Sequence, residues 1–203
     1  NSSIAHAAVS YAYVNYEDSK QDNGTPLYQT VHDVVYPGDP YYASCDRGAA
    51  CAVKWSGYDT SFPSGACSTQ YSYCSSSPKW KKISWGGDTD KLLPGDILIC
   101  NSCHTLMYTG HEIIREVWGD EEIDALPKYS STVAFVEASY GNRSPGLVPL
   151  WGNYVSGVAN GEGHVHNFAA FRCIDPDMSD IYDNAADGVD THVSVRWEDS
   201  PYG

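Results

Sequence analysis

Basic residues are scarce in this sequence. It contains 12 Lys and Arg against 26 Asp and Glu, which gives a formal net charge of −14 at pH 7. Such a chain would be repelled by nucleic-acid phosphates, so we expect no nucleic-acid partner. A cationic or neutral polar partner would suit this charge.

Long apolar runs are also lacking. No stretch approaches the about 18 apolar residues of a membrane-spanning helix, so we expect no membrane span. The first residues lack the basic and apolar segments of a signal peptide, and we expect a mature fragment from which a leader or anchor has been removed. The 203 residues, 42% of them hydrophobic, suit one globular domain with a substantial core, with or without an arm.

Cysteine, by contrast, is abundant, with 7 residues. This number is high for a cytosolic protein of this size and indicates an oxidising compartment, so we expect an extracellular protein. The odd count fits three disulfide bridges and one free thiol. Cys67 and Cys74 flank a short polar segment and form the simplest local pair. The remaining connectivity stays open, as does an all-reduced protein.

Helices are predicted first along the chain, and strands follow. Helical patterns cover residues 2–16, 26–35 and 45–57, and the second has Thr25 as its N-cap. The segment 58–78 is predicted to be a surface loop closed by the Cys67–Cys74 bridge. Strands are predicted within 92–100, 104–110, 112–118, 132–139 and 167–173. This order predicts an α+β fold with an antiparallel sheet, one domain over 1–175, and an acidic arm or tail over 176–203 with one strand at 193–197.

Cys45 is the cysteine best placed for chemistry. Ser44 is a suitable N-cap for a helix that ends near Gly57, so Cys45 lies where free N–H groups and the helix dipole stabilise a thiolate. Asp46 places a negative charge beside the thiol, which Arg47 could offset. The alternative interpretation is a structural cysteine, free or bridged.

Thiol catalysis needs a base near the sulfur and a third polar group that orients the base. His104 opens a strand directly after the apolar segment 94–99 and is the best candidate for the base. Glu137 lies among apolar residues on a later strand and is the candidate for the third group. The alternatives are a structural histidine and a solvent-facing glutamate. The other histidines lack this context: His6, His32, His111, His164, His166 and His192.

These segments resemble the NlpC family of cell-wall cysteine peptidases. The segment 45–57 is similar to the family's nucleophile helix, 94–99 to its Pro-Gly-Asp-Leu strand, and 104–110 to its histidine strand. The strand at 135–139 is similar to the one that carries the third catalytic residue. The sequence departs from the family where Ser44-Cys45-Asp46-Arg47 replaces Asp-Cys-Ser-Gly, and where Glu137 replaces the usual histidine.

The resemblance implies a papain-like fold and mechanism. Cys45 would attack an amide carbonyl with His104 as its proton partner, and the Cys45 N–H would hold the oxyanion. A tyrosine before the cysteine would help to polarise the carbonyl, with Tyr41 preferred over Tyr36 and Tyr42. The implied substrates are peptidoglycan stem peptides, and the implied protein is a bacterial, extracellular or cell-wall-associated monomer that needs no cofactor.

Other interpretations remain open at this stage. Cys100-Asn-Ser-Cys103-His104 spells the pattern of covalent haem attachment, and the same cysteines could form half a zinc site, although a local disulfide or two structural thiols is favoured. The chain could be a catalytically inactive, secreted cell-wall-binding module of the same fold. A CHAP-type amidase uses the same order of cysteine and histidine.

Overall fold

The computed structural model of the protein describes residues 2–19, 24–39, 43–101, 104–126, 133–138, 144–149 and 168–177. Most of the expected C-terminal arm, with its strand at 193–197, lies outside these residues. The helices are α1 (Ser2–Tyr11), α2 (Tyr16–Ser19), α3 (Pro26–Val35), α4 (Cys45–Trp55), α5 (Cys67–Ser76), α6 (His111–Trp118) and α7 (Asp120–Asp124), with a 3₁₀ turn at Thr89–Lys91. The strands are β1 (Trp80–Ile83), β2 (Ile97–Cys100), β3 (His104–Tyr108), β4 (Val133–Glu137), β5 (Gly146–Pro149) and β6 (Phe168–Cys173).

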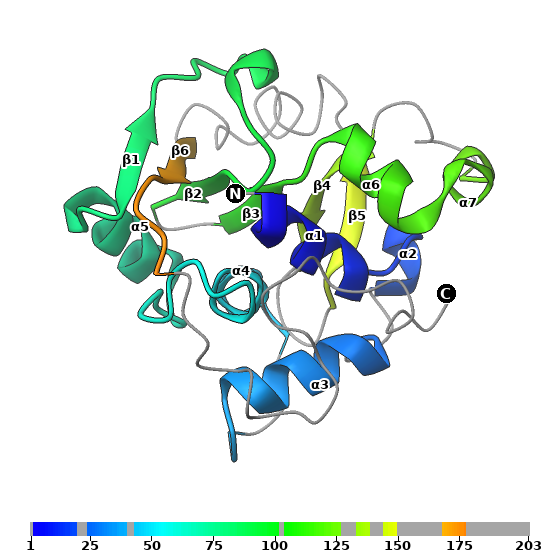
Figure 1. Cartoon of the computed structure of the whole chain (residues 1–203), viewed down its shortest axis with the longest axis horizontal. Helices are drawn as coiled ribbons and strands as arrows, with labels where there is room; N and C mark the ends of the chain where they lie inside the picture. The colour runs from blue at the N-terminus through cyan, green and yellow to red at the C-terminus, as the bar shows by residue number, and fades with distance from the viewer. Residues whose placement is uncertain are drawn as a thin grey trace.

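The six strands form one sheet in the order β1-β6-β2-β3-β4-β5, and every neighbouring pair is antiparallel (Figure 1). The prediction of an α+β fold with an antiparallel sheet is therefore confirmed. Strand β6 comes from the end of the described chain and inserts between β1 and β2. Strands β1 and β2 are therefore joined only through β6.

Each face of the sheet packs in its own apolar cluster. Ile97 pairs with Met107, and both pack in the large cluster between the sheet and the helices. Leu98 pairs with Leu106, and both pack in a smaller cluster on the opposite face with Phe135. This alternation follows from the period of two along a strand. Both sides of the central strands are therefore buried.

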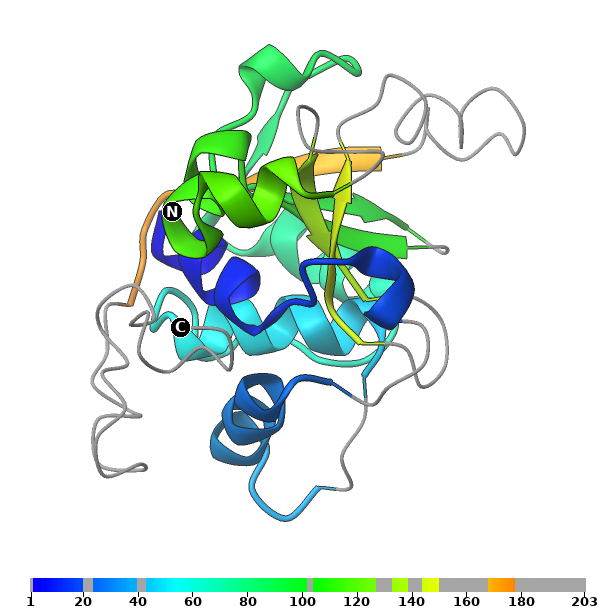
Figure 2. The same cartoon turned by 90° about the vertical axis from the view of Figure 1, so that its right-hand side faces the viewer.

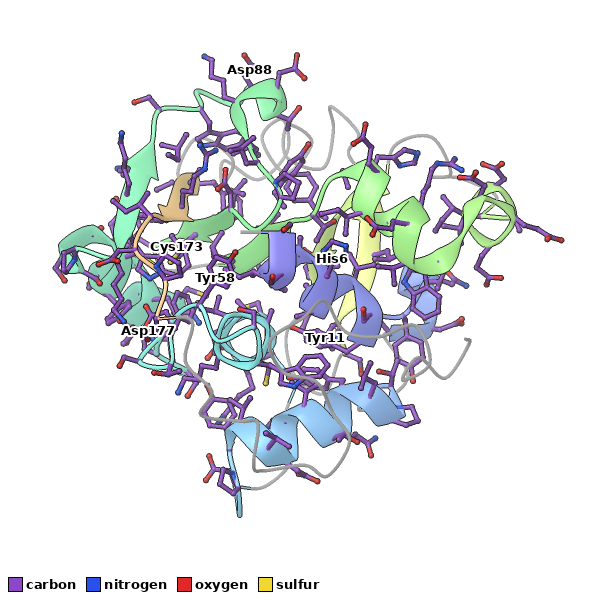
Figure 3. The ribbon with its side chains drawn as sticks, viewed as in Figure 1. His6, Tyr11, Tyr58, Asp88, Cys173 and Asp177 are labelled. Atoms are coloured by element: carbon purple, nitrogen blue, oxygen red, sulfur yellow. The ribbon has the colours of Figure 1, made fainter. Side chains whose placement is uncertain are left out.

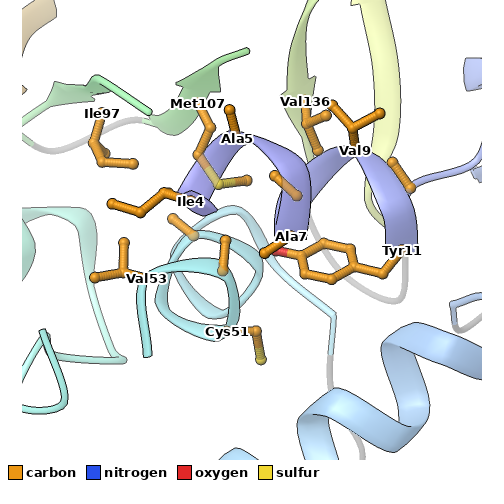
Figure 4. Close-up of a cluster of buried hydrophobic side chains, with 14 of the residues drawn as sticks. Ile4, Ala5, Ala7, Val9, Tyr11, Cys51, Val53, Ile97, Met107 and Val136 are labelled. Atoms are coloured by element: carbon orange, nitrogen blue, oxygen red, sulfur yellow. The ribbon is translucent and has the colours of Figure 1, made fainter. Parts of the chain in front are cut away.

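Helix α1 packs against α4 and α6, while α4 itself packs directly on β3 and β4. Its alanines and Val9 are buried, and their small side chains allow close approach of α4 (Figure 4). At the end of α1 the Tyr11 hydroxyl donates a hydrogen bond of 2.7 Å to the carbonyl oxygen of Gly48. Both views of the ribbon place α4 between α3 and the sheet (Figure 1, Figure 2). Helix α4 is thus enclosed by packed elements on several sides.

The predicted helix starts agree with the structure at α3 and α4. Thr25 accepts a hydrogen bond from the backbone N–H of Tyr28, and Pro26 occupies the first helical position. Ser44 accepts from the N–H of Arg47 and caps α4. Gly57, with a φ of 74°, follows the end of α4 in the conformation that glycine adopts most easily. The helix predicted over 2–16 instead ends at Tyr11.

The prediction of a loop over 58–78 is wrong for the second half of this segment. The predicted Cys67–Cys74 disulfide is also wrong. Residues Cys67–Ser76 form α5, and Cys67 and Cys74 are both free thiols. Seven helical residues separate their Cα atoms by about 10 Å along the axis, which is too far for a disulfide. The expected pattern of three bridges and one free thiol is also wrong, because the free cysteines are Cys45, Cys51, Cys67, Cys74 and Cys173.

The strand predicted at 112–118 is a helix. Residues His111–Trp118 form α6, whose buried residues Ile113, Ile114, Val117 and Trp118 lie on one helical face. Their spacing of one, three and one residues fits the helical period and not the alternation of a strand. The indole N–H of Trp118 donates to the carbonyl oxygen of Val9 at 3.1 Å, which fixes α6 on α1.

The chain after β6 folds back over the loop that follows α4. The backbone N–H of Asp177 donates a hydrogen bond of 2.8 Å to the carbonyl oxygen of Tyr58, and its carboxylate accepts from the N–H of Thr60 at 3.1 Å (Figure 3). Lys79 forms an ion pair with the same carboxylate. The residues just beyond 175 therefore contact the body of the domain.

Candidate active site

Cys45 is the first residue of α4 and is partly buried. Its helix start is fixed by Ser44, whose hydroxyl donates to the Asp46 carboxylate and accepts from the N–H of Arg47. The same carboxylate accepts a hydrogen bond of 3.0 Å from the N–H of Gly65. Asp46 therefore orders the polypeptide around the helix start. Ser44 occupies the N–H of Arg47, whereas the N–H groups of Cys45 and Asp46 have no acceptor within the helix and are available to an anion.

Close packing of α4 against β4 sets the depth of Cys45. Gly48, one turn after Cys45, faces Ala138, and a Cβ atom on Gly48 would lie 3.3 Å from the Cβ of Ala138. Glycine at this position therefore allows the helix to approach the end of β4, where Glu137 is located. A larger residue would push the start of α4 away from the sheet.

His104, which is partly buried, and Glu137, which is buried, form an ion pair across two neighbouring strands. Nε2 of His104, the first residue of β3, lies 2.6 Å from Oε2 of Glu137, the last residue of β4. The Glu137 side chain is almost wholly buried, with 1% of the residue exposed. Burial opposes a charge on the imidazole, but the Glu137 carboxylate and, to a smaller extent, the Cys45 thiol outweigh it and raise the pKa of His104 to about 10.

The same imidazole is coupled electrostatically to the Cys45 thiol: each group favours the charged form of the other, so His104 lowers the pKa of Cys45 and Cys45 raises that of His104. Because Nε2 is engaged by Glu137, Nδ1 is the ring nitrogen left to exchange a proton with the sulfur. The ring also packs edge-on against Phe168 at a centroid distance of 6.4 Å. The structure thus brings together the three residues that the sequence singled out, in the order thiol, imidazole, carboxylate.

A second thiol lies in the site, and sequence analysis missed it. Sγ of Cys67 lies 3.6 Å from Sγ of Cys45, and Cys67 is the first residue of α5. The hydrogen bond from Cys45 stabilises the thiolate of Cys67 more than burial opposes it, and lowers the pKa of Cys67 to about 7. The same contact and burial raise the pKa of Cys45, while His104 acts in the opposite direction. The two sulfurs therefore share one negative charge near neutral pH.

Gln70 holds the elements of the site together. Its amide N–H₂ donates to the carbonyl oxygens of Asp46 at 2.8 Å and Pro63 at 3.0 Å, and its amide oxygen accepts from the Thr105 hydroxyl at 2.8 Å. Gln70 is fully buried. It therefore ties the start of α4 to α5 and to β3. Nothing in the sequence marks this residue, because it lies in a polar segment of weak amphipathicity.

The sequence raised two expectations about the surroundings of Cys45: that Arg47 could offset the charge of Asp46, and that a tyrosine before the cysteine would lie in the site. Arg47 turns away from Asp46: its guanidinium stacks over the Tyr36 ring at 4.1 Å and lies 3.5 Å from the Asp39 carboxylate. The preferred tyrosine, Tyr41, lies outside the described residues. The described candidate, Tyr36, follows α3 and contacts Arg47 and Lys54 rather than the site.

The other described histidines lie elsewhere. His6 contacts the Ser2 carbonyl and the Glu116 carboxylate, His32 is buried beside Tyr28, and His111 accepts from Arg115. His164, His166 and His192 lie outside the described residues.

The state of Cys100 excludes the haem and zinc interpretations. This residue is disulfide-bonded, so its sulfur can form neither a haem thioether nor a zinc bond. Within the described ranges, no group of three or more His, Cys, Asp and Glu residues is arranged to hold a metal ion. In the same part of the chain, no helix combines the length and the apolar character needed to cross a bilayer.

Comparison of the chain with protein-family models, with curated proteins and with solved structures found no match.

Proposed function

We propose that this protein is a cysteine peptidase of papain-like fold that hydrolyses amide bonds in peptidoglycan stem peptides. The observation that carries the proposal is the position of the His104 ring, which contacts Glu137 through Nε2 at 2.6 Å and is coupled electrostatically to the Cys45 thiol. A nucleophile, a base and a group that orients the base are the components of covalent acyl transfer.

In the proposed reaction Cys45 is the nucleophile. The pair of thiols carries one negative charge, and transfer of the remaining proton from Cys45 to Cys67 leaves a Cys45 thiolate facing the His104 imidazolium. The thiolate attacks the carbonyl carbon, and the backbone N–H at the start of α4 stabilises the oxyanion. His104 then gives its proton to the leaving amine. Water, activated by the same imidazole, hydrolyses the thioester.

Glu137 keeps His104 oriented and charged. Its carboxylate is buried on β4, so it cannot gain solvation by turning away, and its contact with Nε2 directs Nδ1 toward the sulfur. The helix with the cysteine, the strand with the histidine and the adjacent strand with the carboxylate occur in the order of a papain-like fold. This order supports that finer fold assignment.

The substrate class follows from the resemblance of the segments around Cys45, His104 and Glu137 to the NlpC family. The net charge of −14 favours the ammonium groups of stem peptides. A bacterial cell-wall location follows from the same proposal.

Digestion of purified peptidoglycan tests the function. The unmodified protein and Cys45→Ala are incubated with the polymer, and new amino termini are counted and the fragments weighed by mass spectrometry. The Cys74→Ala protein is the matched control, because it loses a different buried thiol. We expect new amino termini with the unmodified and Cys74→Ala proteins only. Equal release by Cys45→Ala, or no release by any of them, would contradict the proposal.

The fragment masses also separate a peptidase from a CHAP-type amidase. Cleavage within the stem peptide releases peptides that lack the glycan-proximal residue. Cleavage between glycan and peptide releases the whole stem and leaves unsubstituted glycan. We expect the first pattern.

A further inference from the structure

Two free thiols face each other in the site, each at the start of its own helix. The Sγ atoms of Cys45 and Cys67 are 3.6 Å apart, and a disulfide would require them to approach by about 1.5 Å. We propose that Cys45 and Cys67 form a reversible oxidative modification site, in which a hydroperoxide joins the two sulfurs in a disulfide. The peptidase mechanism uses Cys67 only to accept the Cys45 proton, and it requires no bond between the two sulfurs.

The two helix starts are held in this relation by a buried side chain. The Gln70 amide, one turn along α5 from Cys67, donates to the carbonyl oxygen of Asp46, the residue after Cys45. A second bond joins Gln70 to Thr105 on β3. The two thiols therefore stay adjacent, and small side-chain rotations are enough to bring the sulfurs into bonding distance.

The two sulfurs differ in access and in ionisation. Cys45 is partly exposed, whereas Cys67 is buried with 9% of the residue exposed, so an oxidant from solution meets Cys45 first. The hydrogen bond from Cys45 lowers the pKa of Cys67 to about 7. A thiolate at Cys67 is the form that attacks an oxidised partner. We therefore expect the hydroperoxide to oxidise Cys45, and the Cys67 thiolate to attack the oxidised sulfur and form the disulfide.

The chemistry balances with one hydroperoxide for each pair of thiols. After the Cys45 proton passes to Cys67, the Cys45 thiolate attacks the peroxide oxygen, the O–O bond breaks, the leaving alkoxide or hydroxide takes up a proton from solution, and Cys45 becomes a sulfenic acid. Cys67 then gives up its proton and attacks the Cys45 sulfur as a thiolate, the S–S bond forms, and the leaving hydroxide takes up that proton to become water. Two electrons pass from the thiols to the peroxide. A dithiol reductant reverses the change by thiol exchange.

The consequence for activity rests on the proposed peptidase function. Oxidation would remove the nucleophile and stop hydrolysis. It would also protect Cys45, because a sulfenic acid without a neighbouring thiol proceeds to sulfinic acid, which thiols do not reduce. Cys67 would thus make the loss of activity reversible.

Peptide mapping tests the disulfide directly. Trypsin cleaves after Lys20, Arg47, Lys54 and Lys79, which places Cys45 and Cys51 on separate peptides, while Cys67 and Cys74 share one. The Cys74→Ala protein, with only Cys67 on that shared peptide, is therefore treated with hydrogen peroxide and digested without reductant. We expect the two peptides joined through Cys45 and Cys67, at a mass lower by two hydrogens than their sum. A joined peptide that contains Cys51 instead, or none at all, would overturn the proposal.

The Cys67→Ala variant provides the second measurement. After the same treatment we expect its Cys45 peptide to gain the mass of two oxygen atoms, and this gain to persist after dithiothreitol. The protein with Cys67 should gain no oxygen at Cys45 under these conditions. Equal oxygen gain with and without Cys67 would overturn the proposal, and Cys67→Ser repeats the comparison should Cys67→Ala fail to fold.

Failure of this proposal and failure of the peptidase proposal give different results. A joined peptide without hydrolytic activity would leave the modification site standing and remove the peptidase. Hydrolysis that peroxide abolishes and dithiothreitol does not restore would leave the peptidase standing and remove the modification site.

Discussion

Nε2 of His104 and Oε2 of Glu137 lie 2.6 Å apart at the ends of two adjacent strands. The carboxylate is buried, and a buried charge without a partner is costly, so each residue stabilises the charged form of the other. This pair is the electrostatic centre of the site. The helix with Cys45 approaches it from one side.

The Glu137→Gln substitution tests the role of this charge. Gln keeps the size of the side chain and a hydrogen bond but removes the negative charge, so the pKa of His104 should fall and the wrong ring nitrogen can be protonated. We expect hydrolysis of the substrate to fall about 10⁴-fold, the loss seen when the orienting acid of a catalytic triad is neutralised. Initial rates of amino-terminus release measure the effect.

The control for this substitution is Glu121→Gln, on the exposed surface of α7. Its rate should match that of the unmodified protein. An active Glu137→Gln protein would show that Glu137 is a structural residue only.

The stability of the protein should depend on pH through His104. The pKa of this group is raised to about 10 in the folded protein, from about 6.5 in the unfolded chain. The ion pair is therefore fully stabilising below about pH 6.5, and its contribution is lost as the pH rises through 10. We expect the difference in unfolding free energy between the unmodified protein and Glu137→Gln to shrink over this interval.

Urea titrations at several pH values measure this difference. The thiols titrate in the same interval, but they are present in both proteins, so to a first approximation their effect cancels. A difference that is constant with pH would contradict the assigned direction of the pKa shift.

Removal of the Gln70 amide should destabilise the protein and loosen the site. In Gln70→Ala the partly buried carbonyls of Asp46 and Pro63 and the buried Thr105 hydroxyl lose their partner. We expect a loss of about 2–4 kcal/mol in unfolding free energy, since each buried polar group left unpaired costs about 1–3 kcal/mol. Urea unfolding measures the loss.

The Gln70→Met variant separates hydrogen bonding from packing. Met fills a similar volume without an amide, so it should be about as destabilising as Ala if the hydrogen bonds dominate. Recovery of stability in Gln70→Met would instead assign the effect to the cavity.

Asp96 and Arg172 fix strand β6 to the turn before β2. The guanidinium donates from Nε and Nη2 to the two carboxylate oxygens at 2.8 and 2.6 Å, and the N–H of Leu93 donates to the same carboxylate at 2.8 Å. Asp96 is fully buried. We expect Asp96→Ala to cost about 3 kcal/mol in unfolding free energy, because a buried charge pair loses one partner. The exposed Glu121→Ala should change stability by less than about 0.5 kcal/mol.

The thiol assignments predict a labelling pattern. In protein kept from oxidants and unfolded without reductant, an alkylating reagent should modify Cys45, Cys51, Cys67, Cys74 and Cys173. Cys100 should react only after reduction, because it is disulfide-bonded. Peptide mass spectrometry gives the outcome. If neither Cys67 nor Cys74 reacted before reduction, the two would form the disulfide that the helical structure of α5 excludes, and the assignment of free thiols would be wrong.

The segments that sequence predicted correctly carry strong local signals. Thr25-Pro26 and Ser44-Cys45 mark the starts of α3 and α4, because capping depends on adjacent residues only. Strands β2, β3 and β6 are also evident in the sequence. Both faces of these central strands are buried, so their residues are mostly apolar.

The segments that sequence missed lack such signals. Helix α5 carries only Cys67, Gln70 and Cys74 as buried residues in a polar stretch, so its composition suggested a loop. Strands β1 and β5 lie at the two edges of the sheet, and each contains residues that favour other structures: two lysines in β1, and Gly146 and Pro149 in β5. Edge position and packing on neighbours decide these elements.

The sequence by itself determined the helix start that carries Cys45, the buried central strands, and the candidates His104 and Glu137. It did so because capping residues and apolar periodicity act over a few neighbouring positions. Only the tertiary structure decided that these three side chains meet, that Cys67 lies beside Cys45, and that Gln70 joins their helices. Cys45 and Cys67, Asp46 and Gln70, and His104 and Glu137 lie 22 to 33 positions apart in the sequence. Such separations are set by sheet register and helix packing, which no local pattern encodes.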